Sequence, residues 1–545
     1  MNPESYASPL LNLHELLKKL WSRSLHGSEK HYLFYFLLAV LFTSYYDSIL
    51  DKPPMSYHIW RQADCLSISK KYEQGAPFFE PQMHCLFGDD NTTGKTAGEF
   101  PIMYYLIGRM WNVVGESFFS YRFVMLLYAF IALVLTYHGL MRHFNYSSSA
   151  LFTIAIYTSP ILIFYGVSFL TDAPAYFSIL IGLFFLQEYR FRELKKLFWI
   201  SMFFFAMAGL IKVSSLIAFV FLTAVLFFES LFKWKSLGKK YLFSNPILEI
   251  SGFVSVYVAL FLWYGYAAYY NDLHGFKYTF NSIFPYWEMK PGDSLIKGLK
   301  ETILNSYYSP IALVFMGLLF IYNLISLRKL PGLLSLANIL IPFGGAIYMV
   351  LWGGLLGYHD YYFIALLILF PVVWIPSLYL FSQNKNNQIY LSIALLIFTS
   401  YNVGYAYESQ YVRVRNKIEN PVFVNDHFYL EMLNYKRYGS MKAANNLMEV
   451  RKNLDSWGVQ PEDRLISLPD RTFNYSLYMV NRDGWPKRRF TSLQPYMKLH
   501  INDGAKYALL NNIDEDLMEE LKPYLLEMVG ENNGIKLFRL RPHKE

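Results

Sequence analysis

Residues 197–232 read LFWISMFFFAMAGLIKVSSLIAFVFLTAVLFFESLF, an apolar run that Lys212 interrupts near its centre. A single helix over this run would be roughly 54 Å long, whereas about 20 residues suffice to cross the hydrocarbon core of a bilayer. A lysine within a membrane is costly unless it reaches the surface or a counter-ion. We therefore predict two spans that meet at Lys212, near one surface of a membrane.

Apolar runs of this kind continue through most of the chain. Of its 545 residues, 54% are hydrophobic and 17% are charged, which is more apolar than an average soluble domain. The net charge of +8 does not indicate a nucleic-acid partner, because the basic residues cluster beside apolar runs. We predict a polytopic α-helical membrane protein with about eleven transmembrane helices. The predicted spans are 31–47, 117–140, 148–167, 173–188, 196–211, 213–232, 247–268, 309–327, 332–352, 361–381 and 388–407.

Two further features decide this number of spans. The run 148–188 is divided at Asp172, because Pro174 and the charge both disfavour a continuous helix. Residues 101–115 form a short amphipathic segment with Arg109 in its middle, which predicts a helix lying on the membrane surface. Counting that segment as a span would reverse the orientation of every later loop.

Lysine and arginine in short loops predict the orientation, since they favour the cytoplasmic side. With a cytoplasmic N-terminal segment, 1–30, every inner loop is basic, from Arg142 to Lys385. The transmembrane region 31–407 then has a large first outer loop, 48–116, and the chain ends outside. We expect the inner membrane of a bacterium, with the first span as its own insertion signal.

The composition changes after the last span. Residues 408–545 are charged and mixed, and they predict a small extracytoplasmic α/β domain. The predicted helices are 439–457 and 514–528, and the predicted strands are 464–469, 505–510 and 535–540.

This orientation places four acidic residues on the outer face. Asp64 ends the motif HIWRQAD, Glu99 lies in GEFP, Asp172 in SFLTDAP and Asp360 in GYHDYY. Acids at the water-facing ends of spans can take a proton from an acceptor hydroxyl, orient it, or hold a cation. The candidate catalytic residues are Asp64, Glu99 and Asp172. The candidate phosphate-binding residues are Lys212, Arg122 and Arg61, and the candidates for binding substrate or a metal are His58, His359, Asp360 and Tyr361.

Structural alternatives stand beside these roles. Asp64 could pair with Arg61 alone, and Glu99 or Asp172 could simply favour the start of a helix. Lys212 could extend its stem to the membrane surface. The only two cysteines, Cys65 and Cys85, both fall in the first outer loop, so a disulfide and two free thiols are both open.

Several motifs together resemble a known family. HIWRQAD, GEFPIMYYLIGRMWNVVGE followed by Arg122, SFLTDAP, GLIKVSS and GYHDYY are similar to bacterial glycosyltransferase family 39. That family belongs to the GT-C superfamily, with protein O-mannosyltransferases and the lipid A aminoarabinose transferase. The resemblance covers about residues 30–410. The later stretches RLISLPD, SLYMVNRDGW and GAKYALL resemble the outer domain of one bacterial branch.

The resemblance implies an inverting transfer of a sugar from a polyprenyl-phosphate-linked donor to a lipid, glycan or protein acceptor at the outer leaflet. The acid of the first outer loop, here Asp64, is the usual catalytic candidate. Two positions depart from the pattern: Cys65 stands where a second acid is often found, and Glu99 where the aminoarabinose branch has lysine. The sugar, the acceptor and any divalent cation (Mg, Mn or Zn) therefore stay open.

Two other functions compete with this one. A flippase for a lipid-linked glycan would share the fold, but transporters place ionisable groups near the bilayer midplane, often in repeated halves. A glycan polymerase or ligase would use a diphosphate-linked donor on the same face.

Overall fold

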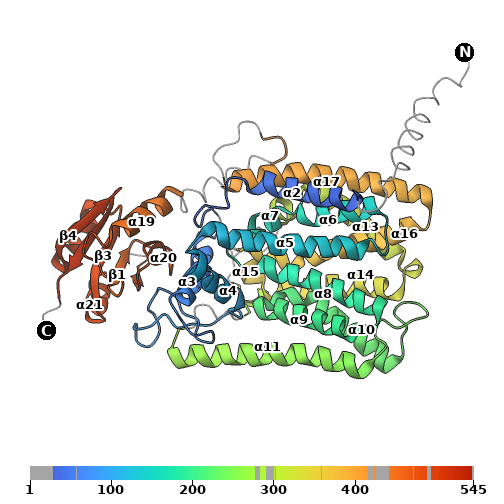
Figure 1. Ribbon diagram of the computed structural model, residues 1–545, viewed down its shortest axis with the longest axis horizontal. Coiled ribbons are helices and arrows are strands. Elements are labelled where there is room, and N and C mark those ends of the chain that lie inside the picture. Colours follow the sequence, from blue (N-terminus) through green and yellow to red (C-terminus); the bar gives the residue numbers. More distant parts are fainter. Residues whose placement is uncertain are drawn as a thin grey trace, which may run out of the picture.

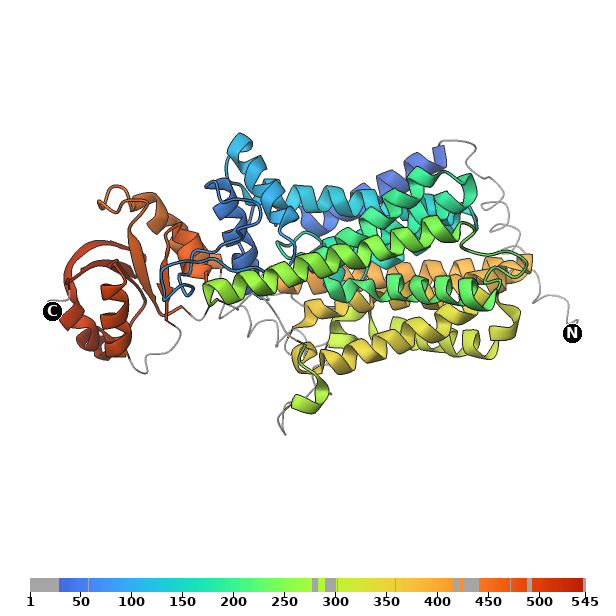
Figure 2. The same ribbon diagram turned by 90° about the horizontal axis from the view of Figure 1, so that it is seen from below.

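The computed structural model describes residues 29–56, 58–276, 283–289, 300, 302–357, 359–414, 421–424, 441–470, 472–487 and 493–542. Most of the predicted N-terminal segment, with Lys18, Lys19 and Arg23, lies outside them. A long helical bundle forms one part of the molecule, and a mixed sheet with its helices lies beyond one end of it (Figures 1 and 2). Helices α3 (Ile59–Glu73) and α4 (Ile102–Val114) lie between the two.

Each predicted span corresponds to helical structure. The long helices are α2 (Glu29–Tyr46), α5 (Phe118–Leu140), α6 (Tyr146–Tyr157), α7 (Pro160–Gly166), α8 (Asp172–Arg192), α9 (Lys195–Ile211), α10 (Ile217–Phe232), α11 (Pro246–His274), α13 (Pro310–Ile325), α14 (Gly332–Leu351), α16 (Leu369–Ser382) and α17 (Lys385–Val414). Shorter helical segments are η2 (Val213–Leu216), η3 (Tyr286–Glu288), η4 (Ile303–Tyr307), η5 (Leu327–Lys329), α15 (Gly353–Leu356) and η6 (Asp360–Ile368).

Among the described residues, six helices are long and apolar enough to cross a membrane, or seven if the bent pair α6 and α7 forms one span. Helices α2, α8, α9 and α13 match further predicted spans but are shorter or less apolar, so the total of eleven stays a prediction. The outer surface of the bundle is apolar, as 85% exposure of Ile247, 79% of Phe261 and 80% of Ile325 illustrates. Such a continuous apolar surface suits lipid chains.

Local sequence explains where several of these helices begin. Helix α11 starts at Pro246 after the capping residue Asn245, and α13 starts at Pro310 after the capping residue Ser309. Proline fits the first helical position because its missing N–H has no partner there, and a short polar side chain accepts a hydrogen bond from the next turn.

Three predicted spans are not regular helices, and one of them, 213–232, begins as the 3-10 segment η2 before α10. The span 148–167 bends by 73° between α6 and α7, because Pro160 removes a backbone donor and restricts the residue before it. The span 361–381 begins as the 3-10 segment η6 before it continues as α16. The predicted break at Asp172 is confirmed, since α8 starts there.

The basic loops gather at the end of the bundle away from α3 and α4. Arg142 pairs with Glu188 near the end of α8, and Arg190 donates to the carbonyl of Tyr241 at 2.9 Å. The backbone of Leu333 donates to Ser236 in the neighbouring loop at 2.7 Å. This segregation agrees with the predicted orientation, although which end faces the cytoplasm stays a prediction.

The C-terminal unit contains a five-stranded sheet in the order β2-β1-β3-β5-β4. Its elements are α19 (Met441–Asn453), β1 (Arg464–Leu468), α20 (Tyr475–Val480), β2 (Gly484–Pro486), α21 (Leu493–Asn502), β3 (Ala505–Asn511), α22 (Glu515–Leu521), η7 (Lys522–Tyr524), β4 (Leu525–Asn532) and β5 (Ile535–Leu540). Strand β1 is parallel to β2 and β3, whereas β5 is antiparallel to β3 and β4.

The three predicted strands are confirmed, but the helix predicted at 514–528 is wrong in its second half. Helix α22 ends at Leu521, and β4 begins at Leu525. Pro523 ends the helical hydrogen-bond pattern, and the following residues form a hairpin with β5, a long-range preference that helical periodicity does not reveal.

The first outer loop and the C-terminal unit share one hydrophobic core. Leu66 and Tyr72 of α3 are buried in the same cluster as Leu447, Leu477 and the strand residue Leu509. The backbone of Gly484 in β2 bonds to the loop on both sides of Cys85, donating to His84 at 3.0 Å and accepting from Leu86 at 2.9 Å. The two segments are therefore packed as one body, although more than 300 residues separate them in the sequence.

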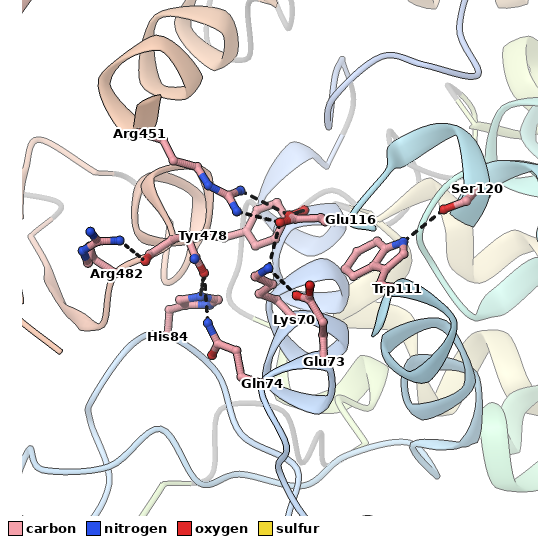
Figure 3. A network of polar contacts seen from close by, with 11 residues as sticks. Lys70, Glu73, Gln74, His84, Trp111, Glu116, Ser120, Arg451, Tyr478 and Arg482 are labelled. Atoms are coloured by element: carbon pink, nitrogen blue, oxygen red, sulfur yellow. Dashed lines mark hydrogen bonds and ion pairs between the residues drawn. The ribbon is translucent and has the colours of Figure 1, made fainter. Parts of the chain in front are cut away.

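Glu116 is the centre of the polar contacts at this junction (Figure 3). Its carboxylate accepts from Arg451 of α19 at 2.6 Å and from the Tyr478 hydroxyl of α20 at 3.1 Å, and it lies 2.9 Å from Lys70 Nζ of α3. Burial raises the pKa of Glu116, but the hydrogen bond and charge of Arg451 and the charge of Lys70 outweigh it, so the pKa is lowered.

Glu116→Gln should reduce the free energy of unfolding at pH 7 by about 1–3 kcal/mol, since three donors lose a charged acceptor. The folded-state pKa of Glu116 is below the unfolded-state value of about 4.5. Its contribution is therefore complete above that value and disappears as the pH falls through the folded-state pKa. Denaturation of the detergent-solubilised protein from pH 7 to pH 3 should show the difference from wild type shrinking on acidification.

Glu449→Gln is the matched control, because Glu449 pairs with Lys452 on the surface, with both side chains about half exposed or more. Exposed pairs of this kind contribute about 0–1 kcal/mol. Equal stability of the two variants would contradict a stabilising role for Glu116.

Candidate functional site

Lys212 lies at the break between α9 and α10. Its backbone is extended, with φ −157° and ψ 103°, and the 3-10 segment η2 follows it directly. Helix α9 begins, and helix α10 ends, at the basic end of the bundle, so the predicted turn at Lys212 lies at the opposite end. The side chain is buried there, with its ammonium 4.8 Å from the ring centre of Tyr362 and 5.8 Å from that of Tyr361.

Glu99 is brought to Lys212 by backbone contacts of its loop. The N–H of Phe100 donates to the carbonyl of Leu210 at 2.9 Å, which satisfies a free acceptor at the end of α9. From α11, the indole of Trp263 donates to the carbonyl of Gly98 at 3.0 Å, and Asn271 bonds to both backbone groups of Ala97. The loop is therefore fixed between α9 and α11.

Four buried charges meet at this point. Lys212 Nζ lies 3.4 Å from a carboxylate oxygen of Glu99 and 3.4 Å from one of Asp172, the first residue of α8. Arg61 of α3 donates to Glu99 at 2.5 Å. Two cations thus balance two anions, which buried charges require.

This pairing keeps Glu99 ionised. Burial raises the pKa of its carboxyl, but Arg61 and Lys212 outweigh it and lower the pKa from 4.5 to about 2. A carboxylate of such low proton affinity is a poor general base near neutral pH. Glu99 instead holds the two cations in place.

A second buried cluster surrounds Asp360. Its carboxylate accepts from the Tyr165 hydroxyl at 2.5 Å and from Arg413 at 3.0 Å, and it lies 3.4 Å from His58 Nε2. The rings of His58 and Tyr361 meet edge to face, 5.0 Å apart. His58, Asp360 and Tyr361 thus connect this cluster with the one at Lys212.

His359 completes the aromatic side of the site. Its ring centre lies 5.1 Å from that of His58 and 5.5 Å from that of Tyr361. Burial and the charge of His58 lower the pKa of His359 to about 3, so the imidazole is neutral near pH 7. Its Nδ1 is buried and forms no hydrogen bond within the described part of the chain.

Arg413 was missed in the sequence. The last span was predicted to end at 407, but α17 continues to Val414 and carries this arginine into the bundle end. The side chain is buried and also donates to Ser306 at 2.8 Å. The sequence does show an arginine six residues after the predicted end of the last span. Because the apolar run has ended by then, its position indicates the outer segment and not the end of a helix.

Asp64 lies apart from the Lys212 cluster. It is fully buried on α3, one turn beyond Arg61, and accepts a hydrogen bond from the Asn474 amide of the C-terminal unit at 2.8 Å. The four acids that were predicted to share the outer face therefore lie at three neighbouring sites: Glu99 with Asp172, Asp360 with His58, and Asp64 with Asn474.

Arg122 is also placed away from Lys212. Its guanidinium donates to the backbone carbonyls of Val167 at 3.0 Å and Lys52 at 3.2 Å, and it stacks over Phe169 at 4.2 Å. It therefore ties the start of the first outer loop to the turn before α8. The two cations of the cluster with Glu99 and Asp172 are therefore Lys212 and Arg61.

Cys65 and Cys85 are both buried free thiols, so the disulfide alternative is not realised. The Tyr104 hydroxyl lies 3.4 Å from Cys65 Sγ. His274 belongs to α11 and pairs with Asp89 at 2.6 Å.

A divalent cation does not fit the acids as they stand. Within the described ranges, no three His, Cys, Asp or Glu side chains converge as ligands. The Glu99 and Asp172 carboxylates already share the ammonium of Lys212. We derive no step through a metal ion.

Comparison with known proteins identifies the fold. No family model matches the chain, and no curated protein matches it in sequence. ArnT from Cupriavidus metallidurans, crystallised with undecaprenyl phosphate, superposes with a TM-score of 0.57 at 12% identity over 94% of this chain and 98% of ArnT. The Archaeoglobus fulgidus oligosaccharyltransferase, crystallised with Zn and sulfate, gives 0.53 at 11% identity over 88% of this chain and 68% of that one. All are members of the GT-C superfamily. The chain has the GT-C fold.

The GT-C arrangement is also found in the mycobacterial arabinofuranosyltransferase AftD, with a TM-score of 0.50 at 12% identity. That likeness covers 95% of this chain but only 40% of AftD. The GT-C fold and the apolar helices together establish a polytopic helical membrane protein.

Lys212→Met should destabilise the protein by about 3–5 kcal/mol, because Glu99 and Asp172 would then share Arg61 as the nearest cation of the cluster. The double variant Lys212→Met/Asp172→Asn should recover part of this loss, since one cation again balances one anion. Thermal denaturation in detergent at pH 7 measures both.

Lys233→Met is the control, because Lys233 is exposed at the basic end of the bundle. If Lys212→Met were as stable as this control, or if the double variant were no better than the single one, charge balance would not hold the cluster together.

Proposed function

We propose that the protein is an integral-membrane glycosyltransferase that moves a sugar from a polyprenyl-phosphate-linked donor to a hydroxyl of a lipid, glycan or protein acceptor. The observation that carries this proposal is the buried cation pair Lys212 and Arg61 at a helix break, balanced by Glu99 and Asp172. The GT-C fold supports it, since ArnT with this fold was crystallised with undecaprenyl phosphate.

The cation pair suits the phosphate of the donor. In a displacement at the anomeric carbon, the bond from that carbon to the phosphate oxygen breaks, and the phosphate keeps the electron pair. Lys212 and Arg61 would stabilise the charge that develops there, in a buried site where such interactions are strong.

Donor binding also requires a rearrangement of charge. The cluster is neutral before the donor arrives, so a phosphate anion must displace a carboxylate from Lys212. Glu99 keeps Arg61 as a partner, whereas Lys212 is the closest cation to Asp172. We propose that Asp172 is released and then orients a hydroxyl of the sugar or the acceptor.

Asp64 is proposed as the general base. It is fully buried on α3 one turn from Arg61, and the amide of Asn474 donates to its carboxyl. The acceptor oxygen would bond to the anomeric carbon from the face opposite the phosphate, with inversion, and its proton would pass to Asp64. His58, His359 and Tyr361 would line the sugar site, where His359 Nδ1 offers a hydrogen-bonding atom.

The reaction would take place on the extracytoplasmic side of a bacterial inner membrane, where the first outer loop and the C-terminal unit are predicted to lie. The C-terminal unit would then cover the site and contribute to selection of the acceptor.

Transfer assays with a panel of radiolabelled polyprenyl-phosphate sugars and a membrane extract as acceptor test this proposal. Asp64→Asn should reduce transfer by about 10²–10⁴-fold, the usual contribution of a general base, while donor binding persists. Lys212→Met should weaken donor binding itself, because the phosphate loses its cation.

Lys233→Met should keep wild-type transfer. Activity only with diphosphate-linked donors would favour a polymerase or ligase. Movement of the donor across vesicle membranes without transfer would favour a flippase, and full activity of Asp64→Asn would remove Asp64 from the chemistry.

A further inference from the structure

Asn474 connects the C-terminal unit to four residues of the first outer loop, one of which is Met83, whose sulfur accepts from the Asn474 amide at 3.0 Å. Its side-chain amide donates to Asp64 Oδ1 at 2.8 Å, and its side-chain oxygen accepts from the N–H of Cys85 at 3.0 Å and from the Ser67 hydroxyl at 3.4 Å. The residue is fully buried. One side chain of the C-terminal unit therefore holds Asp64, the proposed base, together with Ser67 and Cys85.

The direction of the amide is determined by its partners. A backbone N–H can only donate, so the atom facing Cys85 must be the oxygen of Asn474. The nitrogen then has to face Asp64, where it is a donor to the carboxylate. In this contact the amide of Asn474 is therefore the donor and the carboxyl of Asp64 the acceptor.

The side chain of Asn474 does not cap the helix that follows it. It occupies the capping position before α20, where an asparagine side chain usually accepts from the first turn, but it makes no such bond. Asp470 and Thr472 satisfy that turn instead, by accepting from the N–H groups of Ser476 at 2.9 Å and Tyr475 at 2.8 Å. The Asn474 side chain is thus available for Asp64 because two other residues cap its helix.

The chemistry of an amide suits a partner of a general base. A lysine or arginine at this place would neutralise the carboxylate and lower its affinity for a proton, as Arg61 and Lys212 do for Glu99. An uncharged amide orients the carboxylate and stabilises it less.

We infer that Asn474 is a positioning residue for Asp64, so that the C-terminal unit is part of the catalytic apparatus as well as its cover. This inference rests on the proposed role of Asp64 in the transfer reaction. It extends that proposal by assigning a residue from a segment 410 positions away in the sequence.

The test is the pH dependence of transfer by the full-length protein in detergent or vesicles. Asn474→Ala removes the donor to the charged carboxylate, so the acidic limb of the kcat profile should move to higher pH by about one unit. At any pH on the acidic limb, transfer should fall by up to about tenfold, with recovery on alkalinisation, and the KM for the donor should stay unchanged.

Asn474→Asp is the second variant, because it keeps the size of the side chain and an oxygen for the Cys85 N–H. It places a carboxylate against Asp64, and two such groups in one site raise the proton affinity of the pair. The acidic limb should therefore move further than in Asn474→Ala.

Lys71→Met is the matched control. Lys71 pairs with Asp483 at 2.5 Å across the same junction, and its variant should lower stability while leaving the pH profile in place. Wild-type profiles for both Asn474 variants, beside an inactive Asp64→Asn, would overturn the inference and leave the proposed function standing. An active Asp64→Asn would instead overturn the proposed function.

Discussion

The ammonium of Lys212 needs counter-charges, because it is buried at the end of two apolar helices. This requirement accounts for much of the arrangement around it. Asp172 can supply one charge only if α8 begins at that residue, and Glu99 can supply the other only if its loop docks against the end of α9. The interruption of one apolar run thus determines how three distant segments meet.

In the resulting cluster, Lys212 is shared between two carboxylates, those of Glu99 and Asp172. Its charges sum to zero, so a further anion can enter only by exchange with a carboxylate already present. Such an exchange replaces one ion pair at Lys212 with another and leaves the displaced carboxylate without its cation. A neutral buried network can therefore hold the site together before a substrate binds and still accept a phosphate afterwards.

The features of this structure that depend on local composition could be predicted from the sequence. Apolar runs located the helices, and the isolated charges Lys212 and Asp172 marked the helix breaks, because both effects act within a few residues. That Lys212, Glu99 and Asp172 lie at the same end of the bundle followed from an orientation argument, whereas their direct pairing did not. The position of Arg413 could not be predicted in this way, because the apolar run ends before helix α17 does. Strand β4 could not be predicted either, because it forms by pairing with β5.

The contact between Asp64 and Asn474 was beyond sequence reasoning for a different reason. Nothing near Asn474 indicates a partner in the first outer loop, and the residue occupies a position where a local capping role would explain it fully. Long-range packing alone brings the two side chains together. The same packing places the first outer loop in the hydrophobic core of the C-terminal unit, which sequence spacing had suggested to be a separate domain.

That shared core has a consequence for the order in which the protein is made. Synthesis proceeds from the N-terminus, so the first outer loop is complete long before the strands that cover its apolar side chains exist. Helices α3 and α4 pack against each other earlier, as the contact between the Tyr72 and Tyr105 rings shows, but the part of the core that Leu447, Leu477 and Leu509 supply is missing until those residues have been translated. A chain without the C-terminal unit would keep the helical bundle but would leave the outer-loop side of this shared core open to water.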